Sequence, residues 1–158
     1  ELVRRVSEVG GGPAYPMFVP LIVEDARTAE GLRKQPAVAN TMKHFDSITV
    51  ATVAVGSWRT RESQVHDALP DETRAALTRS GTVAEVLGTL IRKDGSVVPD
   101  IRDRVIAMSH TELKSVPELI LVASGERKNE AVKATLAAGL GTTLVIDRNL
   151  ARALLYGP

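Results

Sequence analysis

The sequence predicts an α/β domain in which a parallel β-sheet carries helices on both of its faces. The clearest indication is in the C-terminal part, where an apolar run at residues 119–123 precedes an amphipathic segment at 127–140. A second apolar run at 144–146 and a helical pattern at 149–156 follow after short links. Strand, helix, strand and helix in this order are typical of a βαβ unit in a parallel sheet. A β-branched run at 48–55 predicts a further strand.

The composition favours one globular domain and excludes several other classes of protein. The chain has 158 residues, 44% of them hydrophobic and 25% charged, which is typical of one globular domain. Twenty Lys and Arg against nineteen Asp and Glu give a net charge of +1, and aromatic residues make up 3%, so neither charge nor stacking predicts nucleic-acid binding by this chain. It has no cysteine, which excludes disulfides and thiolate metal sites and favours a cytoplasmic protein. No apolar run reaches the ~20 residues that a membrane span needs.

The N-terminal elements follow from local patterns. Apolar residues at helical spacing predict a helix over 2–9, which three consecutive glycines at 10–12 end. Residues 15–19 predict a short buried strand, and residues 24–35 are rich in helix formers. Pro36 is placed to open a second helix, with Val38, Met42 and Phe45 on one face.

The middle of the chain predicts an excursion from the parallel sheet. Residues 59–70 are polar without a period and predict a loop, whereas 71–79 predict a helix. Residues 82–91 alternate loosely, and the Lys93-Asp94-Gly95 turn before Val97-Val98 predicts a β-hairpin. A predicted strand at 104–108 and a predicted helical turn at 112–116 complete this part.

In the amphipathic helix predicted at 127–140, four residues are expected to face the core, namely Ala131, Val132, Thr135 and Leu136.

Two strand ends carry residues that suit a ligand, because ligands of parallel α/β sheets bind at the carboxyl ends of the strands. Gly56 and Ser57 end one strand, where a glycine allows close approach and a hydroxyl is available. The Ser124-Gly125-Glu126 turn ends another and leads into a helix, whose free N–H groups favour an anion. Lys128 lies in the first turn of that helix, where it could meet a phosphate; the alternative is an ordinary surface lysine.

Glu85 is a carboxylate within an apolar stretch, so it is a candidate to receive a sugar hydroxyl. The alternative, that Glu85 faces solvent on the open side of the hairpin, stays open. His44, His66 and His110 show no metal-ligand spacing, and no nucleophile elbow or phosphate-loop motif is present. The sequence therefore predicts no metal site, no cofactor and no catalytic residues.

An ordered series of short motifs resembles a known family. The series runs from Val55-Gly56-Ser57 through residues 81–88, Asp94-Gly95 and 104–109, and continues through 113–117, 122–128, 131–132 and 151–155. It resembles the C-terminal effector-binding domain of SorC/DeoR-type, sugar-responsive bacterial transcriptional regulators. The similarity extends from Leu2 to Leu155 and is densest from Gly81 onward.

The resemblance implies a Rossmann-like, three-layer fold similar to sugar-phosphate isomerases and glucosamine-phosphate deaminases. It also implies a phosphorylated sugar or polyol as effector, which alters a homodimer or homotetramer and its binding to operator DNA. In the family pattern Lys128 and Glu85 contribute to the effector pocket, and Gly56 and Ser57 line it. The Ser124-Gly125-Glu126 turn belongs to the same expected pocket.

The sequence departs from the family pattern at three points. The helix-turn-helix domain that holds DNA is expected to be a separate N-terminal domain that this chain does not include. The strand and Gly-Gly-Thr-type loop that precede the helix at Leu2 in the family are also missing, so residues 1–158 are expected to form an effector-binding domain without its first strand. Val55-Gly56-Ser57-Trp58 replaces the more usual Gly-Ile-Gly-Ser.

Two other functions remain as alternatives to the ligand sensor. One is a sugar-phosphate isomerase or deaminase of the related fold, with Glu85 as base, Lys128 on the phosphate, and His66 and Asp67 as the source of a ring-opening acid. The other is an oligomerisation module without a ligand. The ordered motifs and the lack of a convincing acid–base pair favour the sensor.

Overall fold

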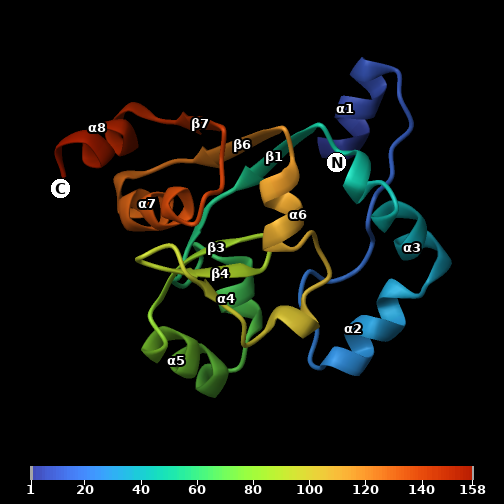
Figure 1. Cartoon of the computed structure of the whole chain (residues 1–158), viewed down its shortest axis with the longest axis horizontal. Helices are drawn as coiled ribbons and strands as arrows, with labels where there is room; N and C mark the ends of the chain where they lie inside the picture. The colour runs from blue at the N-terminus through green and yellow to red at the C-terminus, as the bar shows by residue number, and fades with distance from the viewer. Residues whose placement is uncertain (1, 158) are drawn as a thin grey trace.

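A parallel three-stranded sheet forms the upper part of the molecule in the computed structural model, which describes residues 2–157 (Figure 1). The strands are β1 (Val50–Ala54), β6 (Glu118–Ala123) and β7 (Thr143–Ile146), in the order β1-β6-β7. Helix α7 (Asn129–Ala137) connects β6 to β7, and α8 (Arg148–Tyr156) follows β7. The predicted βαβ unit and the α/β fold class are confirmed.

The two faces of this sheet differ in burial. Side chains alternate along a strand, and in β6 the face with Leu119 and Leu121 is buried in the main core. Helices α6 (His110–Ser115), α7 and α8 contribute to that core. The opposite face carries Val50, Val122 and Val145, which are 54%, 37% and 51% exposed. In the described part of the chain, one face of the parallel sheet is therefore well covered and the other is largely open.

A second, antiparallel sheet packs against α7. Its strands are β2 (Gly56–Ser57), β3 (Thr82–Val86), β4 (Thr89–Arg92) and β5 (Val97–Val98), in chain order. The expected hairpin between β4 and β5 is present, but the excursion is larger than a hairpin. Residues 82–91 form two strands rather than one, because the chain reverses at Leu87 and Gly88, with φ of +47° and +80°. Gly88 permits such a two-residue turn, since positive φ costs glycine little.

Among the described residues before β1, which are residues 2–49, the structure contains three α-helices and no strand. Helices α1 (Leu2–Gly10), α2 (Ala26–Arg33) and α3 (Pro36–Met42) confirm the predicted helices, and a short 3₁₀ helix, η1 (Phe45–Ser47), leads toward β1. The strand predicted at 15–19 is wrong: Pro13, Pro16 and Pro20 lack the N–H that a strand ladder needs.

The strand predicted at 104–108 is also absent. A 3₁₀ helix, η2 (Arg102–Arg104), precedes a single antiparallel bridge between Val105 and Ile22. The Ile106 N–H donates to the Leu21 carbonyl at 2.8 Å. The pairing does not extend into a ladder, because the partner segment follows directly on the proline-rich stretch.

Two details of the helices differ from expectation. The polar segment 59–70 contains a five-residue helix, α4 (Gln64–Ala68), which is too short to show a period; Ser63 caps it by accepting from the His66 N–H at 3.1 Å. Helix α5 (Asp71–Arg79) has the predicted bounds. In α7, Ala131, Val132 and Thr135 are buried as predicted, but Leu136 is 43% exposed.

Candidate effector site

Two neighbouring hollows lie at the carboxyl ends of β1 and β6. The first, of about 400 Å³, includes Gly56, Glu85 and Lys128 in its lining. The second, of about 390 Å³, is lined by the turn after β6, including Ser124, Gly125 and Glu126, and again by Lys128. Six of the seven residues predicted from the sequence therefore lie around two hollows that share Lys128.

Lys128 lies where the two strand ends meet. It is the last residue of a 3₁₀ turn, η3 (Glu126–Lys128), and its Nζ donates a hydrogen bond of 2.7 Å to the Val55 carbonyl, just beyond β1. The side chain is half-buried, and its position next to both hollows is fixed by this bond. Because an ammonium group has three N–H donors, Lys128 keeps donors for a ligand after binding Val55.

Glu85 is buried, which answers the question that the sequence left open. It is 6% exposed; its Oε2 accepts from the Ser63 hydroxyl at 3.0 Å and its Oε1 from the Gly88 N–H at 2.7 Å. Burial raises the pKa of Glu85, and the two hydrogen bonds and the charge of Lys128 oppose that rise in part. Glu85 thus fixes the β3–β4 turn and borders the first hollow.

The turn after β6 is tied to the start of α8. Asp147 Oδ2 accepts from the Ser124 hydroxyl at 2.9 Å and from the Gly125 N–H, while Oδ1 accepts from the Asn149 N–H at 2.8 Å. These donors, the Gly125 N–H first, lower the pKa of Asp147 to about 2. The Gly125 N–H, in the turn before the helix that was expected to favour an anion, thus already binds an internal carboxylate.

Gly56 and Ser57 have different surroundings although they are adjacent. Gly56 pairs with Glu85, and a Cβ on Gly56 would lie 3.0 Å from the Glu62 carbonyl oxygen. Glycine at position 56 therefore allows the backbone of β2 to lie close to the backbone at Glu62. Ser57 is 3% exposed, its buried hydroxyl has no hydrogen-bond partner among the described residues, and it lines neither hollow.

The segment before α4 supplies site residues that the sequence did not indicate. Glu62 lines both hollows, lies 3.5 Å from Arg127 through Oε1, and has a buried Oε2 without a partner among the described residues. Ser63 also lines the first hollow, as does Asp67 of α4, which the sequence named only in the enzyme alternative. Ser63 had one signal, its position as a helix cap, whereas nothing in the local sequence pointed to Glu62.

The described residues show neither a metal site nor a membrane span. No group of three or more His, Asp or Glu within residues 2–157 could hold a metal ion. Across the same residues no helix is long and apolar enough to cross a bilayer. The polar lining of the two hollows includes Lys128, the arginines Arg61 and Arg127, and several carboxyl, amide and hydroxyl groups.

Fold and site together define an α/β domain of the small-ligand-binding type, with its hollows at the carboxyl ends of parallel strands. Residues 1–156 match the family model described as "Putative sugar-binding domain". The chain belongs to this family of sugar-binding domains, which confirms the resemblance seen in the sequence.

Named relatives of this chain are transcriptional regulators. It is 28% identical over 141 residues to "Transcriptional regulator LsrR" of Klebsiella pneumoniae subsp. pneumoniae, and 30% identical over 141 residues to the protein of that name in Escherichia coli O9:H4. Each alignment covers 86% of this chain and 44% of the relative, so the chain spans less than half the length of these proteins. Both relatives are named as regulators and not as enzymes.

Solved structures of transcriptional regulators are also similar to this chain. A domain of a possible sugar-binding transcriptional regulator from Arthrobacter aurescens TC1 is 27% identical, with a TM-score of 0.87 over 97% of this chain and 59% of that one. The full-length sorbitol operon regulator SorC from Klebsiella pneumoniae, 19% identical, matches with a TM-score of 0.80 over 88% of this chain and 46% of that one, which shows the shared fold.

Proposed function

We propose that this chain is the ligand-sensing domain of a sugar-responsive bacterial transcriptional regulator, and that its two hollows bind a phosphorylated sugar or polyol. The observation that carries this proposal is Lys128, a half-buried cation held at the junction of the hollows by the Val55 carbonyl. An ammonium group suits a phosphate, and the carboxyl oxygens of Glu62 and Glu85 suit hydroxyl donors.

The rest of the regulator is part of the same proposal. Its relatives are more than twice as long as the matched region, and they are named as transcriptional regulators. We propose that operator DNA is bound by a separate N-terminal domain, that the effector changes the assembly of a homodimer or homotetramer, and that the protein acts in the cytoplasm. In this scheme the chain described here binds ligand and performs no chemistry on it.

We further propose that the effector-binding domain continues N-terminal to Glu1 and supplies a strand beside β1. Parallel sheets are usually covered on both faces, whereas here Val50 and Val122 lie on an open face and β1 is an edge strand. Hydrogen exchange compares this chain with a version that carries the native N-terminal extension. Slower exchange of the β1 amides in the longer chain supports the proposal, and unchanged exchange contradicts it.

A thermal-shift screen tests the effector proposal. Phosphorylated sugars are compared with their unphosphorylated parents on the chain with its native N-terminal extension. A ligand at about 100 times its dissociation constant stabilises the folded state by ~2.7 kcal/mol, which raises the Tm of a domain of this size by about 5–10 °C. We expect such a rise with one phosphorylated sugar and a much smaller one with its parent.

Two variants complete the test. Lys128→Ala is expected to abolish the rise, whereas Lys133→Ala, which removes an exposed lysine from the following helix α7, is expected to keep it. Recovery of the ligand unchanged after incubation separates a receptor from an isomerase or deaminase. The proposal fails if no phosphorylated sugar stabilises the protein, or if Lys128→Ala responds like the unmodified chain.

A further inference from the structure

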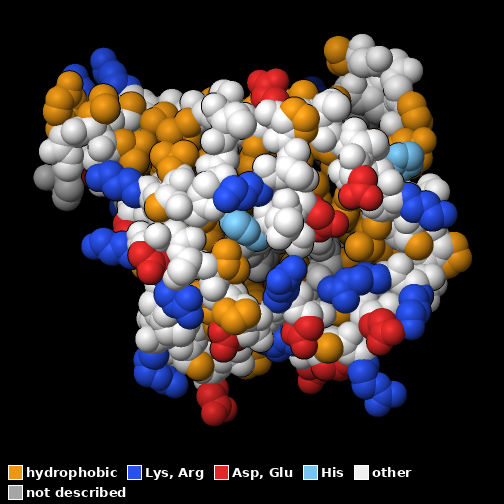
Figure 2. Space-filling view, in the orientation of Figure 1, with side chains coloured by type: hydrophobic (Ala, Val, Ile, Leu, Met, Phe, Trp, Pro, Cys, Tyr) orange, Lys and Arg blue, Asp and Glu red, His pale blue; other side chains and the backbone are white. Residues whose placement is uncertain are grey.

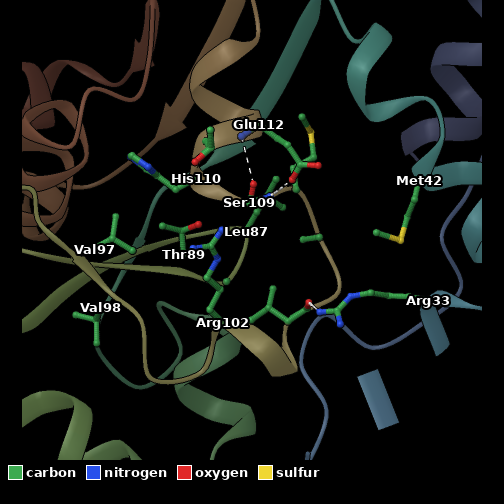
Figure 3. A pocket seen from close by; sticks show the side chains of 15 residues that line it. Arg33, Met42, Leu87, Thr89, Val97, Val98, Arg102, Ser109, His110 and Glu112 are labelled. Atoms are coloured by element: carbon green, nitrogen blue, oxygen red, sulfur yellow. Dashed lines mark hydrogen bonds between the residues drawn. The ribbon is translucent and has the colours of Figure 1, made fainter. Parts of the chain in front are cut away.

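A third cavity lies on the other side of the β3–β4 turn from the candidate effector site. Its volume is about 310 Å³, and it is bounded by α2, α3, the β4–β5 hairpin, η2 and the start of α6 (Figure 3). Leu87 lines both this cavity and the first hollow, so the two spaces adjoin the same residue of the β3–β4 turn. Neither the family pattern nor the motifs in the sequence assigns a role to this cavity.

Two arginines supply the charge of this cavity. Arg102 comes from η2, and its side chain extends toward Thr89 and Leu87 in Figure 3. Within residues 2–157 its guanidinium has no hydrogen bond or ion pair. Arg33 enters from α2, and its Nη2 donates to the carbonyls of Val105 and Asp103, the latter at 3.3 Å. This contact fixes Arg33 in place while its Nε and Nη1 remain available to an acceptor.

The other titratable residues of the lining do not neutralise these arginines. Glu112 is the single carboxylate among the described residues that line the cavity, and its Oε2 accepts from the Ser109 N–H at 2.6 Å in the capping box of α6. The His110 ring is turned away toward the Ala138 carbonyl, 3.0 Å from Nε2. Figure 2 shows basic and acidic side chains together on this face between α2 and α6, whereas the charged lining of the cavity itself consists of two arginines and Glu112, which leaves a net positive charge.

The remaining lining suits the carbon part of a small molecule. Met42 points into the cavity from α3, and Leu87 forms its opposite wall. Thr89, which is 9% exposed, adds a hydroxyl next to Arg102 that has no hydrogen bond among the described residues. Apolar walls with a few converging polar groups are typical of small-ligand sites, and the volume is at the lower end of their usual range.

We propose that this cavity binds a second ligand, a small organic anion whose carboxylate or phosphate group is held by Arg102, while Arg33 adds positive charge on the α2 side of the cavity. A guanidinium binds either anion through two parallel N–H donors, which favours arginine over lysine for this purpose. The ligand's carbon chain lies between Met42 and Leu87, and the Thr89 hydroxyl contacts its anionic end. This proposal does not depend on the identity of the effector at Lys128.

Titration of the ¹⁵N-labelled chain, followed by amide chemical shifts, tests the proposal. The probes are glycerol 3-phosphate for the phosphate group, succinate for the carboxylate, and glycerol as the neutral reference. We expect one or both anions, but not glycerol, to give saturable shifts at Gly88, Thr89 and Arg102. The effector site is followed in the same spectra through Gly56 and Gly125.

Variants assign the shifts to the cavity. Arg102→Ala is expected to weaken binding at least tenfold, since it removes a charge-assisted pair of hydrogen bonds. Arg79→Ala removes an equally exposed arginine from α5 and is expected to leave the binding unchanged, as is Lys128→Ala at the effector site. The proposal is overturned if neither anion shifts these amides, if glycerol shifts them equally, or if Arg102→Ala and Arg79→Ala bind alike.

Discussion

Glu85 is a buried carboxyl group, and its environment makes stability depend on pH. Burial raises its pKa above the value of about 4.5 that applies in the unfolded chain. The folded state therefore binds the proton more tightly than the unfolded state does. The stability that this group contributes is complete below about pH 4.5 and is lost as the pH rises through the pKa of the folded state.

Glu85→Gln removes the titrating carboxyl group, and with it the pH dependence of stability, while its amide can still form hydrogen bonds with Ser63 and Gly88. We expect the variant to gain stability relative to the unmodified chain as the pH rises from 4.5 to 8, because it avoids a buried negative charge. Urea denaturation at several pH values measures the difference between the two free energies of unfolding. A difference that stays constant across this range contradicts the assignment.

At the level of elements, the β3–β4 turn depends on Gly88. Gly88 has φ of +80°, and a Cβ there would lie 2.5 Å from Cγ1 of Val105. We expect Gly88→Ala to destabilise the fold by about 2–4 kcal/mol, from backbone strain together with overpacking. Gly81→Ala is the matched control: φ is +86°, and the nearest atom to its Cβ would lie at 3.7 Å, an ordinary contact, so strain alone should cost about 1 kcal/mol. If urea denaturation gives the same decrease in the free energy of unfolding for both variants, the packing argument is refuted.

The start of α8 depends on Asp147, which also binds the turn after β6. Its pKa is lowered to about 2, so the stability that it contributes is present above about pH 4 and is lost as the pH falls toward 2. We expect Asp147→Ala to lower the Tm at pH 7 by about 2–4 °C and to reduce the loss of stability in acid. Asp100→Ala, at an exposed aspartate, serves as the reference in the same melting series. Identical melting curves for both variants at pH 7 contradict this role.

The success of sequence-based prediction also differed between elements. The C-terminal βαβ unit was predictable because its apolar runs are continuous and its links are short, and α5 because helix formers follow Pro70 with two acidic residues in the first turn. The pattern of β3 continues through Leu87 into β4, so nothing local marked the reversal there. The prolines among residues 13–20 prevented a strand whose apolar residues otherwise fit one, and α4 has too few residues to show a period.

The candidate site could be predicted where it follows from topology. Gly56, Lys128 and the turn after β6 lie at carboxyl ends of parallel strands, a rule that needs no contact information. The positions of Glu62 and Asp147 depend on contacts between segments that are distant in the chain. Glu62 meets Arg127, and Asp147 meets Gly125, through tertiary folding alone.

At the scale of the whole molecule, exposed large apolar side chains lie in two regions, the N-terminal segment 3–18 and the surroundings of the parallel sheet. Figure 2 shows hydrophobic side chains gathered over α8 and β7, where Val145, Leu155 and Tyr156 are 51%, 76% and 84% exposed. Together with Val122 on the open face of β6, these residues form a surface that favours association.

Changing two valines of the open sheet face to threonine tests the effect of this surface. Val122→Thr with Val145→Thr keeps the β-branched shape and adds hydroxyls, so we expect weaker self-association of the 158-residue chain, with stability changed by no more than about 0.5 kcal/mol. Sedimentation velocity over a range of concentrations measures the association. Threonine substitutions at Val83 and Val97, outside the open face, are the comparison. If both double variants associate equally, the open face does not drive assembly.

Leu87, at the tip of the β3–β4 turn, lines both the first hollow of the effector site and the cavity near Arg102. Glu85 holds the same turn through the Gly88 N–H. Any movement of this side chain that enlarges one space reduces the other. Occupants of the two spaces would therefore alter each other's affinity by the same factor, as thermodynamic reciprocity requires, and a regulator built on this domain could respond to a ratio of two metabolites rather than to one concentration.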